Sequence, residues 1–196
     1  MRAAALAIGL FVSGCAFTPE TIRIIPTFAA APERGAERVE LKLEVADLRP
    51  EPTDVVARKV NGFGMQLAPI SSDVPVVDVL KQAAVSAITA RGYRVGTAGA
   101  LVLTLELLVF SHAFIPGFWS AKSEATLIFL ATLRDASGKE LLRKVMSDAF
   151  HHQVQLAVGD NVVKAYEGVL VQSLERLVTL EAFRTALTGS AAPPPL

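Results

Sequence analysis

The sequence has little of what reactive chemistry needs: one cysteine, three histidines and one tryptophan among 196 residues. A single cysteine cannot form an intramolecular disulfide, so no disulfide framework holds this fold. Acidic and basic side chains balance at 19 each, and a chain without net charge is poorly suited to nucleic acid or to an anionic surface. These shortages argue against a nucleic-acid-binding protein and against a thiolate metal site.

Long apolar runs are also scarce. The longest run in the body of the chain, residues 101–110, is interrupted by Thr104 and Glu106. A second run, residues 3–12, would extend about 15 Å as a helix, which is about half the thickness of a bilayer core. The sequence therefore predicts no membrane-spanning helix.

What the N-terminus does have is typical of a secretory signal: the basic Arg2, an apolar core and small residues before Cys15. The segment Val12-Ser13-Gly14-Cys15 resembles the bacterial lipobox, in which the cysteine receives a diacylglyceryl group. The alternative is an ordinary signal peptide with an incidental cysteine. We predict lipidation at Cys15 with fatty acyl chains such as palmitate, because two or three chains together make a stable anchor.

This interpretation divides the chain into four parts. We expect a lipoprotein signal peptide over 1–14, a lipidated cysteine and tether over 15–36, one globular domain over 37–188 and a disordered tail over 189–196. Three prolines interrupt the tether, although Ile22, Ile24 and Ile25 suggest that part of it lies along the domain. Residue 16 is alanine, and in Gram-negative lipoproteins that resemble this one an aspartate there signals inner-membrane retention. The resemblance thus implies the outer membrane, facing the periplasm.

Hydrophobic periodicity predicts the elements of the domain. Period-2 alternation indicates strands over 39–45, 55–60, 101–110 and 125–133, followed by a more polar strand over 139–155 nearer an edge. Apolar stripes at helical spacing indicate one helix from about 74 to 91, capped by Asp73, and a last helix from about 159. Odd-numbered residues from Leu101 to Val109 are expected to face the core.

Two helices with one-sided stripes need a sheet face to cover. The predicted fold class is therefore α+β: a two-layer sandwich in which a mostly antiparallel sheet of 4–5 strands carries two helices on one face. The strand over 39–45 is expected to pair parallel to the strand over 101–110, through a right-handed crossover.

Four features together resemble the YajG-like family of bacterial lipoproteins. They are the lipobox, Val45-Ala46-Asp47-Leu48-Arg49-Pro50 after the first strand, the helix ending at Arg91-Gly92-Tyr93-Arg94-Val95, and the strand from Leu101. The likeness covers roughly residues 39 to 180. It implies localisation and fold, and it carries no catalytic residue over to this chain.

The candidate contact site is the connection between the two central strands, which contains Phe114, Ile115, Phe118 and Trp119 around a Pro116-Gly117 turn. Hairpin tips are normally polar, and an apolar cluster at a tip marks a contact with protein or membrane. The alternative is that these rings fold back and cap the core of the sheet.

The remaining candidates have simple structural explanations beside the functional ones. Asp47 and Arg49 share a strand face and form either a polar ligand site or an ion pair at the turn. His151 and His152 are adjacent and point to opposite faces of a strand, so they cannot hold one metal ion together. We expect no metal, no cofactor and no catalytic residue, because the sequence has no Gly-x-Ser-x-Gly motif and no phosphate-binding loop.

The sequence thus predicts a membrane-anchored periplasmic lipoprotein that acts as a binding or assembly accessory in the cell envelope and is not an enzyme. Its expected partners are the membrane, through the anchor, and an envelope protein. The alternative is a hydrolase that acts on an envelope polymer, which would require a polar cleft with paired carboxylates.

Overall fold

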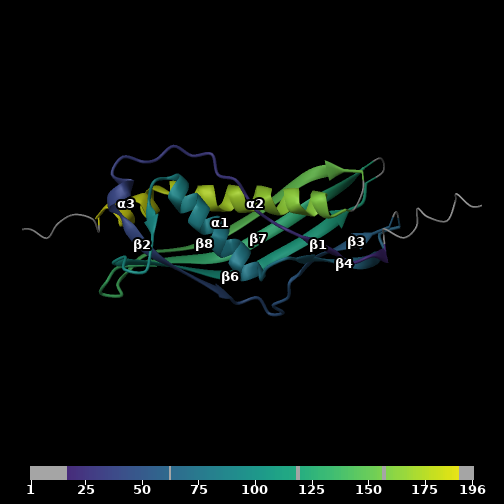
Figure 1. The fold of residues 1–196 in the computed structure, drawn as a ribbon, viewed down its shortest axis with the longest axis horizontal. Helices are drawn as coiled ribbons and strands as arrows, with labels where there is room; N and C mark the ends of the chain where they lie inside the picture. The colour runs from purple at the N-terminus through teal and green to yellow at the C-terminus, as the bar shows by residue number, and fades with distance from the viewer. Residues whose placement is uncertain (1–16, 62, 118–119, 156–157, 190–196) are drawn as a thin grey trace, which may run out of the picture.

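The computed structural model describes residues 17–189 except 62, 118–119 and 156–157, and has an α+β fold (Figure 1). In chain order its elements are β1 (Glu20–Ile22), a 3-10 helix (Ala36–Arg38), β2 (Glu40–Asp47), β3 (Val55–Val60), β4 (Gln66–Ser72), α1 (Val76–Ala90), β5 (Arg94–Val95), β6 (Leu101–Ile115), β7 (Ala121–Arg134), β8 (Glu140–Val154), α2 (Gly159–Thr179) and α3 (Glu181–Gly189). The predicted fold class is confirmed. Two details differ: the strands form two sheets rather than one, and a short third helix, α3, follows α2.

The larger sheet has the strand order β5-β2-β6-β7-β8. Strand β2 pairs parallel to β6, as the sequence predicted, while β6, β7 and β8 follow one another as an antiparallel meander. The β7–β8 hairpin closes on Asp135, whose carboxylate accepts hydrogen bonds from the backbone N–H groups of Ser137 (2.8 Å) and Lys139 (3.1 Å). Strand β8 is an edge strand, in agreement with its polar sequence.

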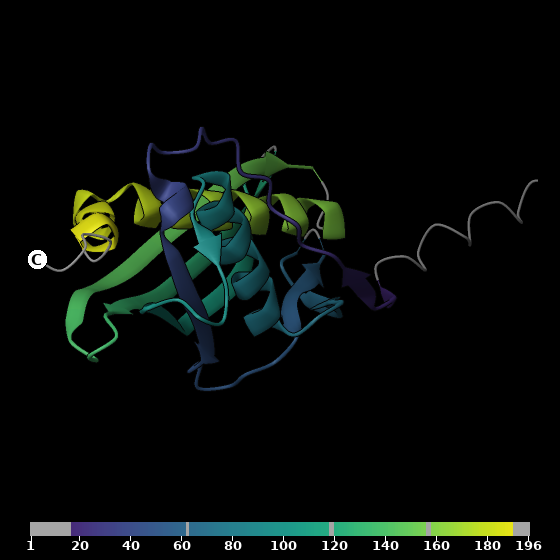
Figure 2. The same cartoon turned by 60° about the vertical axis from the view of Figure 1, so that its left-hand side comes forward.

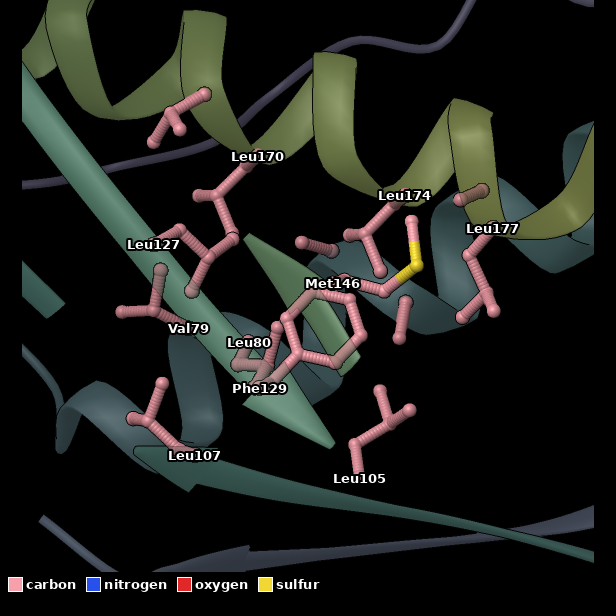
Figure 3. Close-up of a cluster of buried hydrophobic side chains, with 14 of the residues drawn as sticks. Val79, Leu80, Leu105, Leu107, Leu127, Phe129, Met146, Leu170, Leu174 and Leu177 are labelled. Atoms are coloured by element: carbon pink, nitrogen blue, oxygen red, sulfur yellow. The ribbon is translucent and has the colours of Figure 1, made fainter. Parts of the chain in front are cut away.

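Both long helices lie on one face of this sheet (Figures 1 and 2). Figure 3 shows their side chains meeting those of the strands in one apolar layer. The layer contains Val79 and Leu80 from α1, Leu170, Leu174 and Leu177 from α2, and Leu105, Leu107, Leu127, Phe129 and Met146 from the sheet, all at most 2% exposed. Leu103 is also fully buried, so the interior of the sheet and the helix stripe at Leu170 and Leu174 face each other as the periodicity predicted.

The smaller sheet has the order β1-β4-β3 and lies at the end of the molecule where the described part of the chain begins (Figures 1 and 2). It is fastened to the larger layer by the buried Tyr166 of α2, whose hydroxyl donates a hydrogen bond to the carbonyl of Val56 in β3 (2.7 Å). The smaller sheet therefore has a fixed position against α2 and β6.

The start of α1 differs from the sequence prediction. Asp73 does not cap the helix, because its carboxylate pairs with Arg23 in the N-terminal segment. The N–H of Val76 donates instead to the carboxylate of Asp54, at 3.3 Å, from the loop before β3. A residue distant in sequence thus satisfies one of the helix's free N–H groups.

Replacement of Leu105 by alanine should lower the free energy of unfolding by about 2–5 kcal/mol, because the side chain is fully buried between the sheet and the helices. Chemical denaturation followed by circular dichroism measures the change. Leu48→Ala is the matched control, since Leu48 is 52% exposed and its truncation should cost far less. Equal losses in the two variants would show that the assignment of the core face of β6 is wrong.

Candidate functional site

The segment expected to be a tether is part of the fold from Glu20 onward. Residues 20–22 form β1, which pairs parallel to β4, and the side chains of Ile22 and Ile24 are buried. The N–H of Ile25 donates to the carboxylate of Glu167 in α2 (3.2 Å), while the Ile25 side chain is exposed. Because five residues span at most about 17 Å, the folded body begins close to Cys15.

A β-bulge in β6 controls which side chains face this end of the molecule. The register with β7 shifts between Leu107 and Val109, so one extra residue is inserted in β6. Before the bulge the odd-numbered residues face the helices, and after it the even-numbered residues Phe110, His112 and Phe114 do. The expectation that Val109 faces the core is therefore wrong, because the bulge reverses the alternation.

The bulge also lies where β6 loses a neighbour. Strand β2 pairs with β6 only as far as Leu107, whose carbonyl accepts a last hydrogen bond from the N–H of Leu48 (2.8 Å). Within the described part of the chain no strand pairs with that side of β6 from Val109 to Ile115. The end of β6 thus has a free strand edge.

A groove of about 390 Å³ lies between this free edge and strand β3. Its walls are residues 55–58 of β3 and residues 110–114 of β6, and Gly64 and Gln66 line it from the β3–β4 side. Its lining is mixed: apolar side chains from both strands together with Arg58, Ser111 and His112. The described residues that line it include no aspartate or glutamate.

His112 is held at the inner side of the groove by a hydrogen-bonded chain. Its Nε2 lies 2.7 Å from the hydroxyl oxygen of Ser123, and that hydroxyl donates to the carbonyl of Asn161 (2.9 Å). The serine proton is therefore engaged, so Nε2 must carry the proton and donate to the serine oxygen. The buried Nδ1 of His112 has no hydrogen-bond partner among the described residues.

Although a serine beside a histidine suggests a nucleophile and its base, the arrangement here is structural. Ser123 is fully buried, its proton is already donated, and no carboxylate orients the far nitrogen of His112. The ring of His112 contacts the rings of Phe114 and Tyr166. The ring of Phe110 stacks in parallel on that of Tyr166, with their centroids 4.1 Å apart. Burial, and to a smaller extent the nearby His152, together lower the pKa of His112 from 6.5 to about 4.

The two described residues of the predicted aromatic tip point to opposite faces of β6, and the bulge decides which of them faces inward. Phe114 points inward and is 9% exposed, whereas Ile115 points outward and is 41% exposed. Phe118 and Trp119 lie outside the described residues. Phe63 and Met65, which are 92% and 58% exposed between β3 and β4, were not predicted as contact residues. The signal that could have found Phe63 is an aromatic residue between two glycines, Gly62 and Gly64.

Asp47 and Arg49 form a two-pronged ion pair at the end of β2. The guanidinium donates to both carboxylate oxygens, at 2.8 and 2.7 Å, and also to the carbonyl of Thr53 (3.1 Å). The hydrogen bonds from Arg49 lower the pKa of Asp47 below its usual value. The pair thus closes the loop that leads from β2 to β3.

Other chemistry finds little support in the described part of the chain. No group of three histidine, cysteine or acidic side chains there is placed to hold a metal ion. None of the described helices has the length and apolar character needed to cross a membrane.

At the far end of α2, Glu33 accepts hydrogen bonds from the Tyr93 hydroxyl (3.0 Å) and the Arg184 guanidinium (2.7 Å). These two bonds tie α3 to the segment before β2.

The partly buried, neutral His112 should make the protein less stable in acid. Its pKa is about 4 in the fold and about 6.5 when unfolded, so the unfolded chain binds more protons between these values and stability falls as pH falls from 6.5 to 4. The loss attributable to His112 is up to about 3 kcal/mol. In His112→Gln the slope of unfolding free energy against pH should be shallower. The same slope in both proteins would contradict this assignment.

Comparison with solved structures shows a likeness of fold. The protein XCC0632 from Xanthomonas campestris (family DUF330) is 15% identical with a TM-score of 0.60, and the alignment covers 88% of this chain and 96% of that chain. A minor lipoprotein from Acinetobacter baumannii is 14% identical with a TM-score of 0.38, covering 76% of this chain and 91% of that one. At these identities only a likeness of fold is supported, and the first structure alone supports it.

Sequence comparison is more decisive. No curated protein matches the chain. A family model described as "Uncharacterized lipoprotein" matches residues 26–188, which is most of the chain and includes the groove, the bulge and both long helices. The resemblance to YajG-like lipoproteins is thereby confirmed, and the chain belongs to this family of uncharacterized lipoproteins.

Proposed function

We propose that this lipoprotein is exported, anchored through Cys15 to the outer membrane facing the periplasm, and acts there as a binding or assembly accessory. Membership of a lipoprotein family supports the lipid anchor, and the lipobox-like Val12-Ser13-Gly14-Cys15 supplies the cysteine. The accessory role is carried by one observation: a groove that runs beside the free edge of β6.

A free strand edge is a recognised means of binding an extended protein segment. Its backbone N–H and C=O groups can pair with an added strand, while side chains beside the edge select the sequence. Here the edge from Val109 to Ile115 provides the backbone groups, and residues 55–58 of β3 provide a facing wall. The proposed partner is therefore an extended segment of another envelope protein.

The groove is less suited to a hydrolase of an envelope polymer. Glycoside hydrolysis commonly uses two carboxyl groups on either side of the scissile bond. The groove's described lining has only Arg58 and His112 as titratable side chains, and His112 is partly buried with a pKa far below neutrality. The groove therefore favours a binding role for this protein over a catalytic one.

The anchor can be tested by Cys15→Ala. The wild type should incorporate labelled fatty acid and sediment with membranes, whereas the variant should incorporate none and keep its signal segment, because Cys15 is the chain's one cysteine. Radiolabelling and fractionation of cells that make each protein provide the measurement. Retained label in the variant would contradict lipidation at this site.

The groove can be tested by placing a photo-activated cross-linking amino acid at Ala113 or Arg58, both exposed beside the groove. Ala136, exposed in the β7–β8 hairpin, is the matched control position. Irradiation of intact cells should give adducts of one mass at both groove positions and none at Ala136. Equal adducts at all three positions, or none at the groove, would count against the groove as the binding site.

A further inference from the structure

Four large apolar side chains are exposed at the end of the molecule where the described part of the chain begins. Phe17 is 69% exposed, Phe63 92%, Met65 58% and Ile115 41%. They come from three segments far apart in sequence: the residues before β1, the β3–β4 turn and the end of β6. We refer to these four residues as the end patch.

Strand pairing places the three segments together. Strands β1 and β4 run parallel, with Glu20 opposite Ile70, so the residues before β1 and those before β4 leave the small sheet at the same end. Gly64 of the β3–β4 turn and Phe114 of β6 line the same groove. Figure 1 shows β1, β3 and β4 side by side at one end of the molecule.

The turn that carries Phe63 and Met65 is firmly held. The side-chain oxygen of Asn61 accepts hydrogen bonds from the N–H groups of both residues, each at 3.0 Å, and the Asn61 N–H donates to the Met65 carbonyl (3.1 Å). Such bonds fix the backbone of a turn. Phe63 and Met65 are therefore held by their backbone N–H groups against Asn61.

The distance to Cys15 identifies what faces this patch. Phe17 is two residues from Cys15 and can be no farther from it than about 7 Å, and β1 begins within about 17 Å. If Cys15 is acylated, Phe17 lies near the lipid surface, and the other three residues of the end patch are exposed at the same end of the molecule. Exposed apolar side chains gain about 25 cal/mol for each Å² removed from water, which favours their burial among the lipids.

We propose that the end patch inserts into the headgroup region of the membrane and holds the domain upright, with the groove beside the lipid surface and the β7–β8 hairpin away from it. This inference rests on the proposed anchor at Cys15. Lys122 of β7 is exposed and lies opposite Ile115 of β6. Its ammonium group is therefore at the same height as the end patch, where it can pair with lipid phosphates.

The test uses the full-length acylated protein carrying Phe63→Cys. With Cys15 acylated, the new thiol is the one free thiol in the chain, and it is labelled with the environment-sensitive dye NBD. The protein is added to vesicles of phosphatidylethanolamine and phosphatidylglycerol, with or without lipids that carry a nitroxide quencher near the headgroup. Ser137→Cys in the β7–β8 hairpin is the matched control.

On vesicles, the dye at position 63 should shift its emission to the blue and lose most of its fluorescence to the quencher, while the dye at 137 should do neither. A protein that floats with the vesicles but keeps a water-like dye at 63 overturns the inference and leaves the anchor intact. A blue shift without quenching, growing with protein concentration, overturns it in favour of a second copy covering the patch. Failure to float overturns the anchor and, with it, this inference.

Discussion

The architecture of the end of the molecule that carries the groove and the end patch depends on one irregularity, the extra residue in β6 between Leu107 and Val109. Because strand side chains alternate with period 2, a single inserted residue moves the following set to the other face. The insertion brings Phe110 onto Tyr166, turns His112 toward Ser123 and leaves Ile115 outside. Without it, His112 and two phenylalanines would lie on the open face of the sheet.

A second consequence follows from the position of the bulge. It lies where β2 stops pairing with β6, so the edge that opens there is bordered by β3 of the other sheet. The Tyr166 hydroxyl donates a hydrogen bond to the Val56 carbonyl of β3, and the Tyr166 ring stacks on Phe110 of β6, so Tyr166 contacts both strands that border the groove. One buried tyrosine therefore determines the separation of the two walls of the groove.

Regular alternation made much of this fold predictable, since the strands over 39–45 and 125–133 and both long helices follow simple periods. The bulge was not predictable, because Leu107, Leu108 and Val109 are all apolar and give no sign of which one is inserted. Strand β4 was missed because Pro69 lies within it, and proline is disfavoured inside a central strand. The aromatic tip was noticed from sequence, but the exposure of Phe63 depends on how the two sheets pack.

We propose that the end of the molecule that carries the end patch is where this lipoprotein binds, and that the free edge of β6, the β3–β4 turn and the lipid surface act together there. Hydrogen–deuterium exchange on the acylated protein, in detergent and then in membranes isolated from its own cells, tests this most directly. The account predicts slower exchange in membranes for residues 63–66 and 109–115 and no change for residues 135–139. Slowing confined to residues 135–139, or spread evenly over the domain, would contradict it.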